Sequence, residues 1–153
     1  MTTMEVPRDR EQRKRDVLER LENEMDIWVA SADTGGVPCL VALWFVWHED
    51  AVWLATRPTN PTGRNLATGT RAARLAFGDT RDVVLIDGDV EVHSREKVPA
   101  AAAEAFHRKT GWDPRADRAV YAYYRVRPRA VQSWHEVREL PQRHIMRDGR
   151  WVV

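Results

Sequence analysis

The sequence predicts a mainly β fold: one compact, largely antiparallel β-barrel with peripheral helices. Six or more short runs of apolar and β-branched residues follow one another, separated by clusters of Gly, Pro, Asp and Asn. Helical patterns are few and stand at the ends of these runs. The length of 153 residues suits one domain with a sizeable core and is short for two.

The first element expected is an amphipathic helix within residues 8–25. Acidic and basic residues alternate in this segment, which favours a solvated helix face over a basic arm. Apolar residues recur among them at helical spacing: Val17, Leu18, Leu21 and Met25.

Three β-runs in series follow and predict a meander. They read I-W-V-A-S-A, C-L-V-A-L-W-F-V-W and A-V-W-L-A-T, and the turns between them read D-T-G-G-V-P and H-E-D-A. The second run is apolar on both pleat faces, which is typical of a strand covered on both sides.

A short helix is expected after the meander. Asn60 suits its N-cap, Pro61 its first helical position and Gly69 its end. Two further strands, A-A-R-L-A-F and V-V-L-I-D-G-D-V-E-V-H-S, come next. Asp87-Gly88 lies inside the second of them and indicates a bulge or a sharp bend.

Pro99 opens a clear helix that ends at Gly111. In the run A-V-Y-A-Y-Y-R-V-R-P-R-A-V-Q-S-W-H, we expect Pro128 to break the strand in two or to bend it. Asp148-Gly149 between apolar residues predicts a short hairpin in the tail. The expected organisation is an N-terminal helix at 1–25, a barrel domain at 26–137 and a C-terminal tail at 138–153.

Composition limits the classes of function. A formal charge of +1, from 24 basic and 23 acidic residues, gives no electrostatic case for a nucleic-acid or membrane partner. No apolar run approaches the roughly 18 residues of a membrane span, and no apolar signal core begins the sequence, so a cytoplasmic protein is expected. Cys39 is the only cysteine, and we interpret it as a small buried apolar residue.

The segment W-L-A-T-R-P-T-N-P-T-G-R-N-L, residues 53–66, is the main candidate for a functional site. A helix N-terminus presents free backbone N–H groups and partial positive charge, and Gly63 would let an anion approach them. Arg57 and Arg64, with neighbouring threonine hydroxyls, could add hydrogen bonds to a phosphate. On composition alone, a strand-to-helix connection with solvated arginines explains the segment equally well, and no known phosphate-loop motif is present.

Other candidate chemistry is sparse. The five histidines are not spaced as metal ligands, so no metal site is expected. No G-x-S-x-G elbow is present and Cys39 has no partner signature, so catalytic residues stay unassigned. The seven tryptophans are first of all core or interface residues, although some could flank a planar aromatic ligand.

The order of these segments resembles the pyridoxamine 5'-phosphate oxidase-like split barrels, which bind flavin or deazaflavin cofactors. The resemblance rests on D-I-W-V-A-S-A-D-T-G-G-V-P-C-L-V-A-L-W-F-V-W, A-V-W-L-A-T-R-P-T-N-P-T-G-R-N-L, R-A-A-R-L-A-F and V-V-L-I-D-G-D-V-E-V, and it covers residues 15–137. The sequence is most similar to the short actinobacterial members, many of which use the deazaflavin coenzyme F420. The resemblance implies a six-stranded antiparallel split barrel that forms a homodimer, with two cofactor sites at the subunit interface.

The resemblance also implies positions for the cofactor. The planar ring would lie along the second and third strands, and the phosphate where the third strand passes into the short helix. Trp134 matches an aromatic position near the interface. The implied contacts are Val41, Leu43, Trp44, Ala55 and Thr56 for the ring, and Arg57, Thr59, Thr62, Arg64 and Asn65 for the phosphate.

Two features depart from the family pattern. Many relatives carry a lysine in the R-K-x-R-N-L part of the loop, whereas this sequence reads P-T-G-R-N-L and gains Pro58 and Pro61. The longer signature of true pyridoxamine phosphate oxidases is absent, which disfavours vitamin B6 oxidation.

The sequence is therefore interpreted as an oxidoreductase that transfers a hydride between coenzyme F420, or alternatively FMN, and an unsaturated or oxidised organic small molecule. The short length and an Arg- and Ala-rich composition typical of GC-rich genomes favour F420. One alternative is a non-catalytic flavin, deazaflavin or haem carrier, in which His93 or His135 would be the axial ligand of a haem. Another is a structural interaction domain that has lost its ligand.

Overall fold

The computed structural model describes residues 6–153, so the first five residues of the expected N-terminal segment lie outside the described residues. The described elements are α1 (Arg10–Asn23), β1 (Asp26–Ala32), β2 (Pro38–His48), β3 (Ala51–Thr56), α2 (Pro61–Thr68), β4 (Ala72–Ala76), β5 (Asp82–Ser94), α3 (Ala100–Thr110), η1 (Pro114–Ala116), β6 (Ala122–His135), η2 (Val137–Glu139), β7 (His144–Arg147) and β8 (Arg150–Trp151).

Six antiparallel strands close into a barrel in the order β1-β2-β3-β6-β5-β4, with β4 again beside β1. The closing contact is the β3–β6 pair, in which Val52 lies opposite Val126 and Thr56 lies opposite Ala122. The predicted antiparallel barrel and the β1–β3 meander are confirmed.

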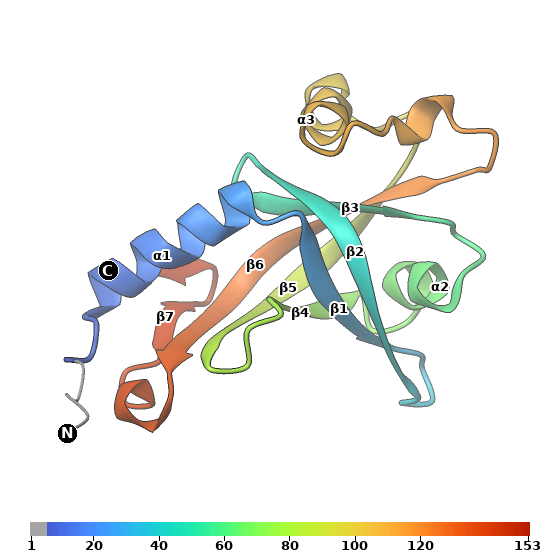
Figure 1. Cartoon of the computed structure of the whole chain (residues 1–153). Coiled ribbons are helices and arrows are strands. Elements are labelled where there is room, and N and C mark those ends of the chain that lie inside the picture. Colours follow the sequence, from blue (N-terminus) through green and yellow to red (C-terminus); the bar gives the residue numbers. More distant parts are fainter. Residues whose placement is uncertain (1–5) are drawn as a thin grey trace.

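The helices cover three different parts of the barrel (Figure 1). α1 and α2 lie at its two ends, and Val17, Leu21 and Leu66 bring them into the core inside the barrel. α3 lies on the outer surface, where Phe106 packs with Trp53 in a second apolar cluster. The two clusters explain why β3, which lies between them, is buried on both faces.

β6 is one continuous strand of 14 residues, so Pro128 does not break it. Its register against β5 shifts at the predicted bulge: Gly88 lies opposite Pro128, whereas Asp87 lies opposite Ala130. At the same place β6 changes its other neighbour, from β3 before residue 127 to β7 from Val131 onward. A proline, which has no N–H to donate, suits a stretch of strand with no strand paired on that side.

The C-terminal strands β7 and β8 extend the sheet beyond β6 (Figure 1). Asp148 and Gly149 both adopt positive φ angles, +51° and +76°, between β7 and β8. Positive φ at both central residues is the conformation that two-residue hairpins favour, so the predicted hairpin is confirmed.

The outer face of β2 is exposed along most of its length. Leu40 and Trp44 are 61% and 42% exposed, and Trp28 on β1, which lies opposite Ala42, is 43% exposed. The prediction of a strand covered on both sides is therefore wrong for one chain, because α3 covers only the end of β2 near Val46. Trp28, Leu40, Ala42 and Trp44 together are called the β1–β2 face below.

Candidate cofactor-binding site

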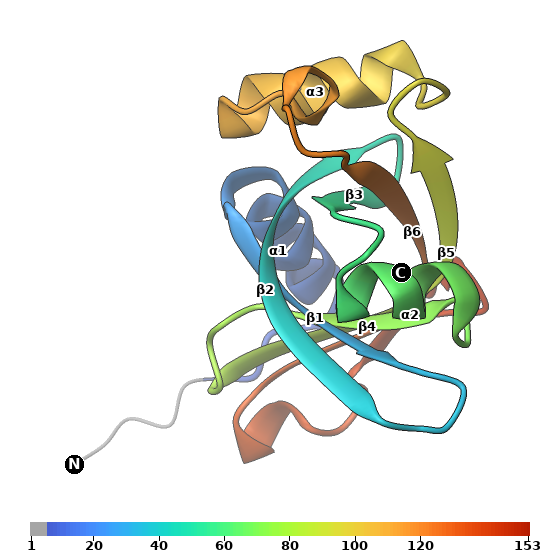
Figure 2. The same cartoon turned by 90° about the vertical axis from the view of Figure 1, so that its right-hand side faces the viewer.

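The candidate phosphate segment, residues 53–66, lies at one end of the barrel, where β3 passes through a turn into α2 (Figure 2). A tight turn joins them, because the Asn60 N–H donates to the Arg57 carbonyl at 3.0 Å. Asn60 occupies the predicted N-cap position, but its side chain donates to Thr56 Oγ1 at 3.3 Å and does not cap α2. No asparagine oxygen therefore competes with an anion at this helix end.

Gly63 has a packing role that the sequence did not indicate. A Cβ at this position would overlap the Arg57 carbonyl oxygen and lie 2.9 Å from the Tyr124 hydroxyl. The glycine lets the first turn of α2 rest directly on the turn that precedes it. The sequence interpretation attributes Gly63 to the approach of an anion, but close packing of the chain explains this glycine without an anion.

Arg57 and Arg64 are both exposed, and neither forms an ion pair with a carboxylate in the described part of the chain. The Arg64 guanidinium folds back and donates from Nη1 to the Thr59 carbonyl at 2.6 Å. Both positive charges therefore stay available at the start of α2, where an anion would be stabilised.

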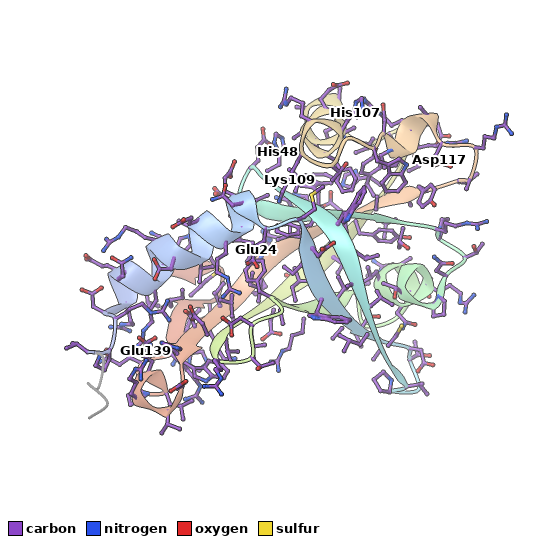
Figure 3. All side chains as sticks on the ribbon, viewed as in Figure 1. Glu24, His48, His107, Lys109, Asp117 and Glu139 are labelled. Carbon is purple, nitrogen blue, oxygen red and sulfur yellow. The ribbon has the colours of Figure 1, made fainter. Side chains whose placement is uncertain are left out.

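Asp117, on the connection between α3 and β6, is a neighbour of this segment that the sequence did not reveal (Figure 3). Hydrogen bonds from the Ala119 N–H and from Trp112 Nε1, at 2.9 and 3.0 Å, lower the pKa of its carboxyl group. The positive charge of Arg57 lowers this pKa further. Asp117 is therefore ionised and attracts Arg57 at a distance without binding it.

Three aromatic side chains, those of Trp44, Trp112 and Tyr121, lie together at the same connection. The Trp112 ring meets Tyr121 edge-on at 4.7 Å and Trp44 at 6.5 Å between centroids. Trp44 is one of the residues assigned to the cofactor ring, and it joins this group to the exposed β1–β2 face. More than 60 residues separate Trp44 from Trp112, so no local pattern could have indicated their contact.

A groove of about 360 Å³ runs between α2 and the β1–β2 hairpin, with Arg64 and Asn65 on its wall. The Asn65 side chain donates to Ser31 Oγ at 3.2 Å. Thr62 is only 3% exposed, and its hydroxyl lies 3.4 Å from the sulfur of Cys39. Cys39 is partly exposed on this groove, so the interpretation of it as a buried apolar residue is wrong.

The residues assigned to the ring do not form an open surface within one chain. Ala55 and Thr56 are each 6% exposed, and Ala55 packs beneath α3. Val41 and Leu43 pack against the core inside the barrel. Only Trp44 of this set is substantially exposed.

Trp134 lies far from the other candidates along β6. Thr56 pairs with Ala122, and Trp134 comes twelve residues later on the same strand, about 40 Å along the chain at strand spacing. One chain therefore does not bring Trp134 to the phosphate segment.

The two histidines considered as haem ligands already have close neighbours. His93 Nε2 lies 2.6 Å from a Glu91 carboxylate oxygen, and its ring packs on Trp53. His135 Nδ1 lies 2.9 Å from the Arg138 guanidinium. Within residues 6–153, no group of three His, Cys, Asp or Glu side chains is arranged to hold a metal ion.

A closed six-stranded barrel with this arginine-bearing loop after its third strand defines a split-barrel protein. The chain belongs to the pyridoxamine 5'-phosphate oxidase family, whose family model matches residues 14–147. A search of curated proteins finds no match. No helix in the described part of the chain is both long and apolar enough to cross a membrane.

Similar solved structures support the same fold. They include an F420 reductase, with 21% identity and a TM-score of 0.60 over 74% of this chain and 93% of that one. HutZ, a haem storage protein from Vibrio cholerae, has 11% identity and a TM-score of 0.63 over 80% and 94%. The conserved hypothetical protein Rv2991 from Mycobacterium tuberculosis has 18% identity and a TM-score of 0.63 over 82% and 86%.

Proposed function

We propose that this protein is an oxidoreductase that transfers a hydride between coenzyme F420, with FMN as the alternative, and an unsaturated or oxidised organic small molecule. Family membership and the structural likeness to an F420 reductase support this proposal. One observation carries the proposal: Arg57 and Arg64 are exposed beside an uncapped helix start, and neither forms an ion pair with a carboxylate of residues 6–153.

The chain would contribute binding, orientation and exclusion of water, and the bound cofactor would supply the hydride chemistry. Arg57 and Arg64 would hold the phosphate by charge-assisted hydrogen bonds. Thr59 and Asn65 would add neutral hydrogen bonds from the turn and from the groove wall. The polar residues of the segment fit a phosphate, whereas the ring needs a surface that one chain does not complete.

We propose that a second copy of the chain completes the site. The β1–β2 face is apolar and exposed, which is typical of a surface buried in an assembly. A homodimer would also allow Trp134 of one copy to approach the phosphate segment of the other. We also propose a cytoplasmic location, as the sequence interpretation expects.

Sedimentation analysis tests the homodimer. Wild-type protein should show about twice the mass of the 17.7 kDa chain, because burial of the apolar face favours association. Leu40→Glu should shift the protein toward the monomer, since it places a charge on that face. A wild-type protein that stays monomeric at every concentration would overturn this part of the proposal.

Fluorescence titration with F420 and with FMN tests the cofactor site. Wild-type protein should bind at least one of them saturably, and the double variant Arg57→Ala with Arg64→Ala should bind it at least tenfold more weakly. Arg108→Ala with Arg147→Ala removes the same charge from exposed positions elsewhere and is the matched control. Unchanged affinity in the first variant would remove the site assignment.

Turnover separates the enzyme from a carrier. A panel of enones and quinones should oxidise the reduced cofactor in the presence of the wild-type protein. Saturable cofactor binding with no turnover on any substrate of the panel would favour the non-catalytic carrier.

A further inference from the structure

The barrel has a second groove, of about 540 Å³, where β6 leaves β3 and has not yet reached β7. It is called the β6 groove here. Its walls come from the β2–β3 turn, the middle of β6 and the β7–β8 hairpin. Its lining includes four arginines and two tryptophans: Arg125, Arg127, Arg129, Arg150, Trp47 and Trp151.

The four arginines form few close ion pairs. Arg125 and Arg150 form no ion pair within residues 6–153. Arg127 and Arg129 share a single carboxylate, Asp89, at 3.7 and 3.6 Å, which is too long for a hydrogen bond. Sharing one acceptor leaves most of their donor groups free for another anion.

Three carboxylates also line the groove: Glu49, Asp50 and Asp148. None of them forms an ion pair with the four arginines. Together with Asp89 they equal the four arginines in number, and they would repel a long polyanion that passes through the groove. This arrangement favours a compact ligand over an extended one.

The groove is held by rigid elements. The Arg129 carbonyl accepts the Gly149 N–H at 2.8 Å, which fixes the hairpin turn against β6. A Cβ on Gly149 would lie 3.4 Å from Arg129 Nη1, an ordinary van der Waals distance, so that guanidinium lies beside the hairpin turn. Trp47 and Trp151 pack against the barrel core and give the groove an apolar floor, which strengthens nearby charge interactions.

We propose that the β6 groove binds a compact anion that carries at least two phosphate or carboxylate groups. Its volume lies in the range of small-molecule sites, and arginine recognises both groups through paired N–H donors. The groove is formed by residues other than those of the phosphate segment, so the inference does not depend on the proposed oxidoreductase function.

Calorimetric titration of the full chain with tripolyphosphate and with citrate tests the proposal and separates the two chemical sources. At least one probe should bind saturably at low ionic strength and more weakly at high ionic strength. Arg150→Ser should weaken this binding about tenfold, because it removes a charge-assisted contact. Arg127→Ser should also weaken binding. Arg127 lies on β6, whereas Arg150 lies on β8.

Arg147→Ser is the matched control. Arg147 is exposed, pairs with Arg150 across the hairpin and does not line the groove. Arg147→Ser should change the affinity for the probe less than twofold. The double variant Arg57→Ala with Arg64→Ala should leave this affinity unchanged. The proposal is overturned if neither probe binds saturably, if Arg147→Ser weakens binding as much as Arg150→Ser, or if only the Arg57 and Arg64 variant weakens it.

Discussion

Arginines at the two ends of the molecule differ in how many partners surround them. Figure 3 shows Glu139 at one end and Asp117 at the other. Near Glu139, Arg8 reaches three carboxylates, those of Glu139 at 2.7 Å and of Asp16 and Asp82 at 2.9 Å each. Near Asp117, Arg57 binds no carboxylate of the described residues.

The charged side chains at the two ends also differ in how deeply they are buried. Glu139 and Arg13 are 2% and 3% exposed, and Arg13 Nη1 donates to the carbonyls of Ser133, Glu139 and Gln142. Arg64, in the phosphate segment, is exposed and donates to one carbonyl. The residue type alone therefore does not identify a binding site. The number of partners supplied by the fold separates an arginine that holds the structure from one that is free for a ligand.

Loss of Glu139 should have the largest effect. Glu139→Ala leaves Arg8 and Arg13 without their buried carboxylate, and we expect the free energy of unfolding to fall by about 3–5 kcal/mol. Arg64→Ala, at the opposite end, should change it by no more than about 0.5 kcal/mol. Urea denaturation measures both, and equal losses would abolish the distinction between the two ends.

Acid should weaken the same network. Burial opposes ionisation of Glu139, but hydrogen bonds from the Arg8 side chain and from the Arg8 and His135 N–H groups outweigh it and hold its pKa at about 2. A pKa below the ordinary value of 4.5 means that Glu139 stabilises the fold fully above that pH. This contribution, on the order of 3 kcal/mol, should be lost as the pH falls from about 4.5 to about 2.

Denaturation at a series of pH values isolates this effect when wild type is compared with Glu139→Gln. The difference between the two proteins should shrink across the acid range, because wild-type Glu139 becomes protonated there. A difference that stays constant with pH would show that ionised Glu139 does not support the network.

A smaller loss is expected from Gly63→Ala at the phosphate end. The added methyl group meets the Arg57 carbonyl, and we expect a destabilisation of about 1–3 kcal/mol together with weaker cofactor binding. Gly78→Ala is the control, because a Cβ there has no neighbour within 4 Å. Thermal unfolding of both variants checks the comparison, and a neutral Gly63→Ala would mean that this turn moves freely.

The strands and helices were predictable because their signals are local. Alternating apolar residues, Pro99 before a helix and Asp148-Gly149 in a hairpin each act within a few residues. The uncovered face of β2 was not predictable, because its cover depends on where α3 packs.

The phosphate segment could be recognised as one continuous run, but its surroundings could not. Asp117 approaches Arg57 through a connection about 60 residues later in the chain. The bonds between Arg8 and Glu139 join residues 131 positions apart, and both look like ordinary surface charges in the sequence. Such pairs follow from the closed topology and leave no local pattern.

The closing pair of the barrel also bears on how the protein reaches its native state. Thr56 and Ala122 pair although they are 66 positions apart, whereas the β1–β3 meander forms between strands that are neighbours in sequence. The entropy of closing so long a loop is lost before the contacts compensate for it, so we expect β3 to join β6 late in folding. Arg57 directly follows Thr56. The segment proposed to bind the cofactor phosphate would therefore acquire its final geometry only in one of the last folding steps.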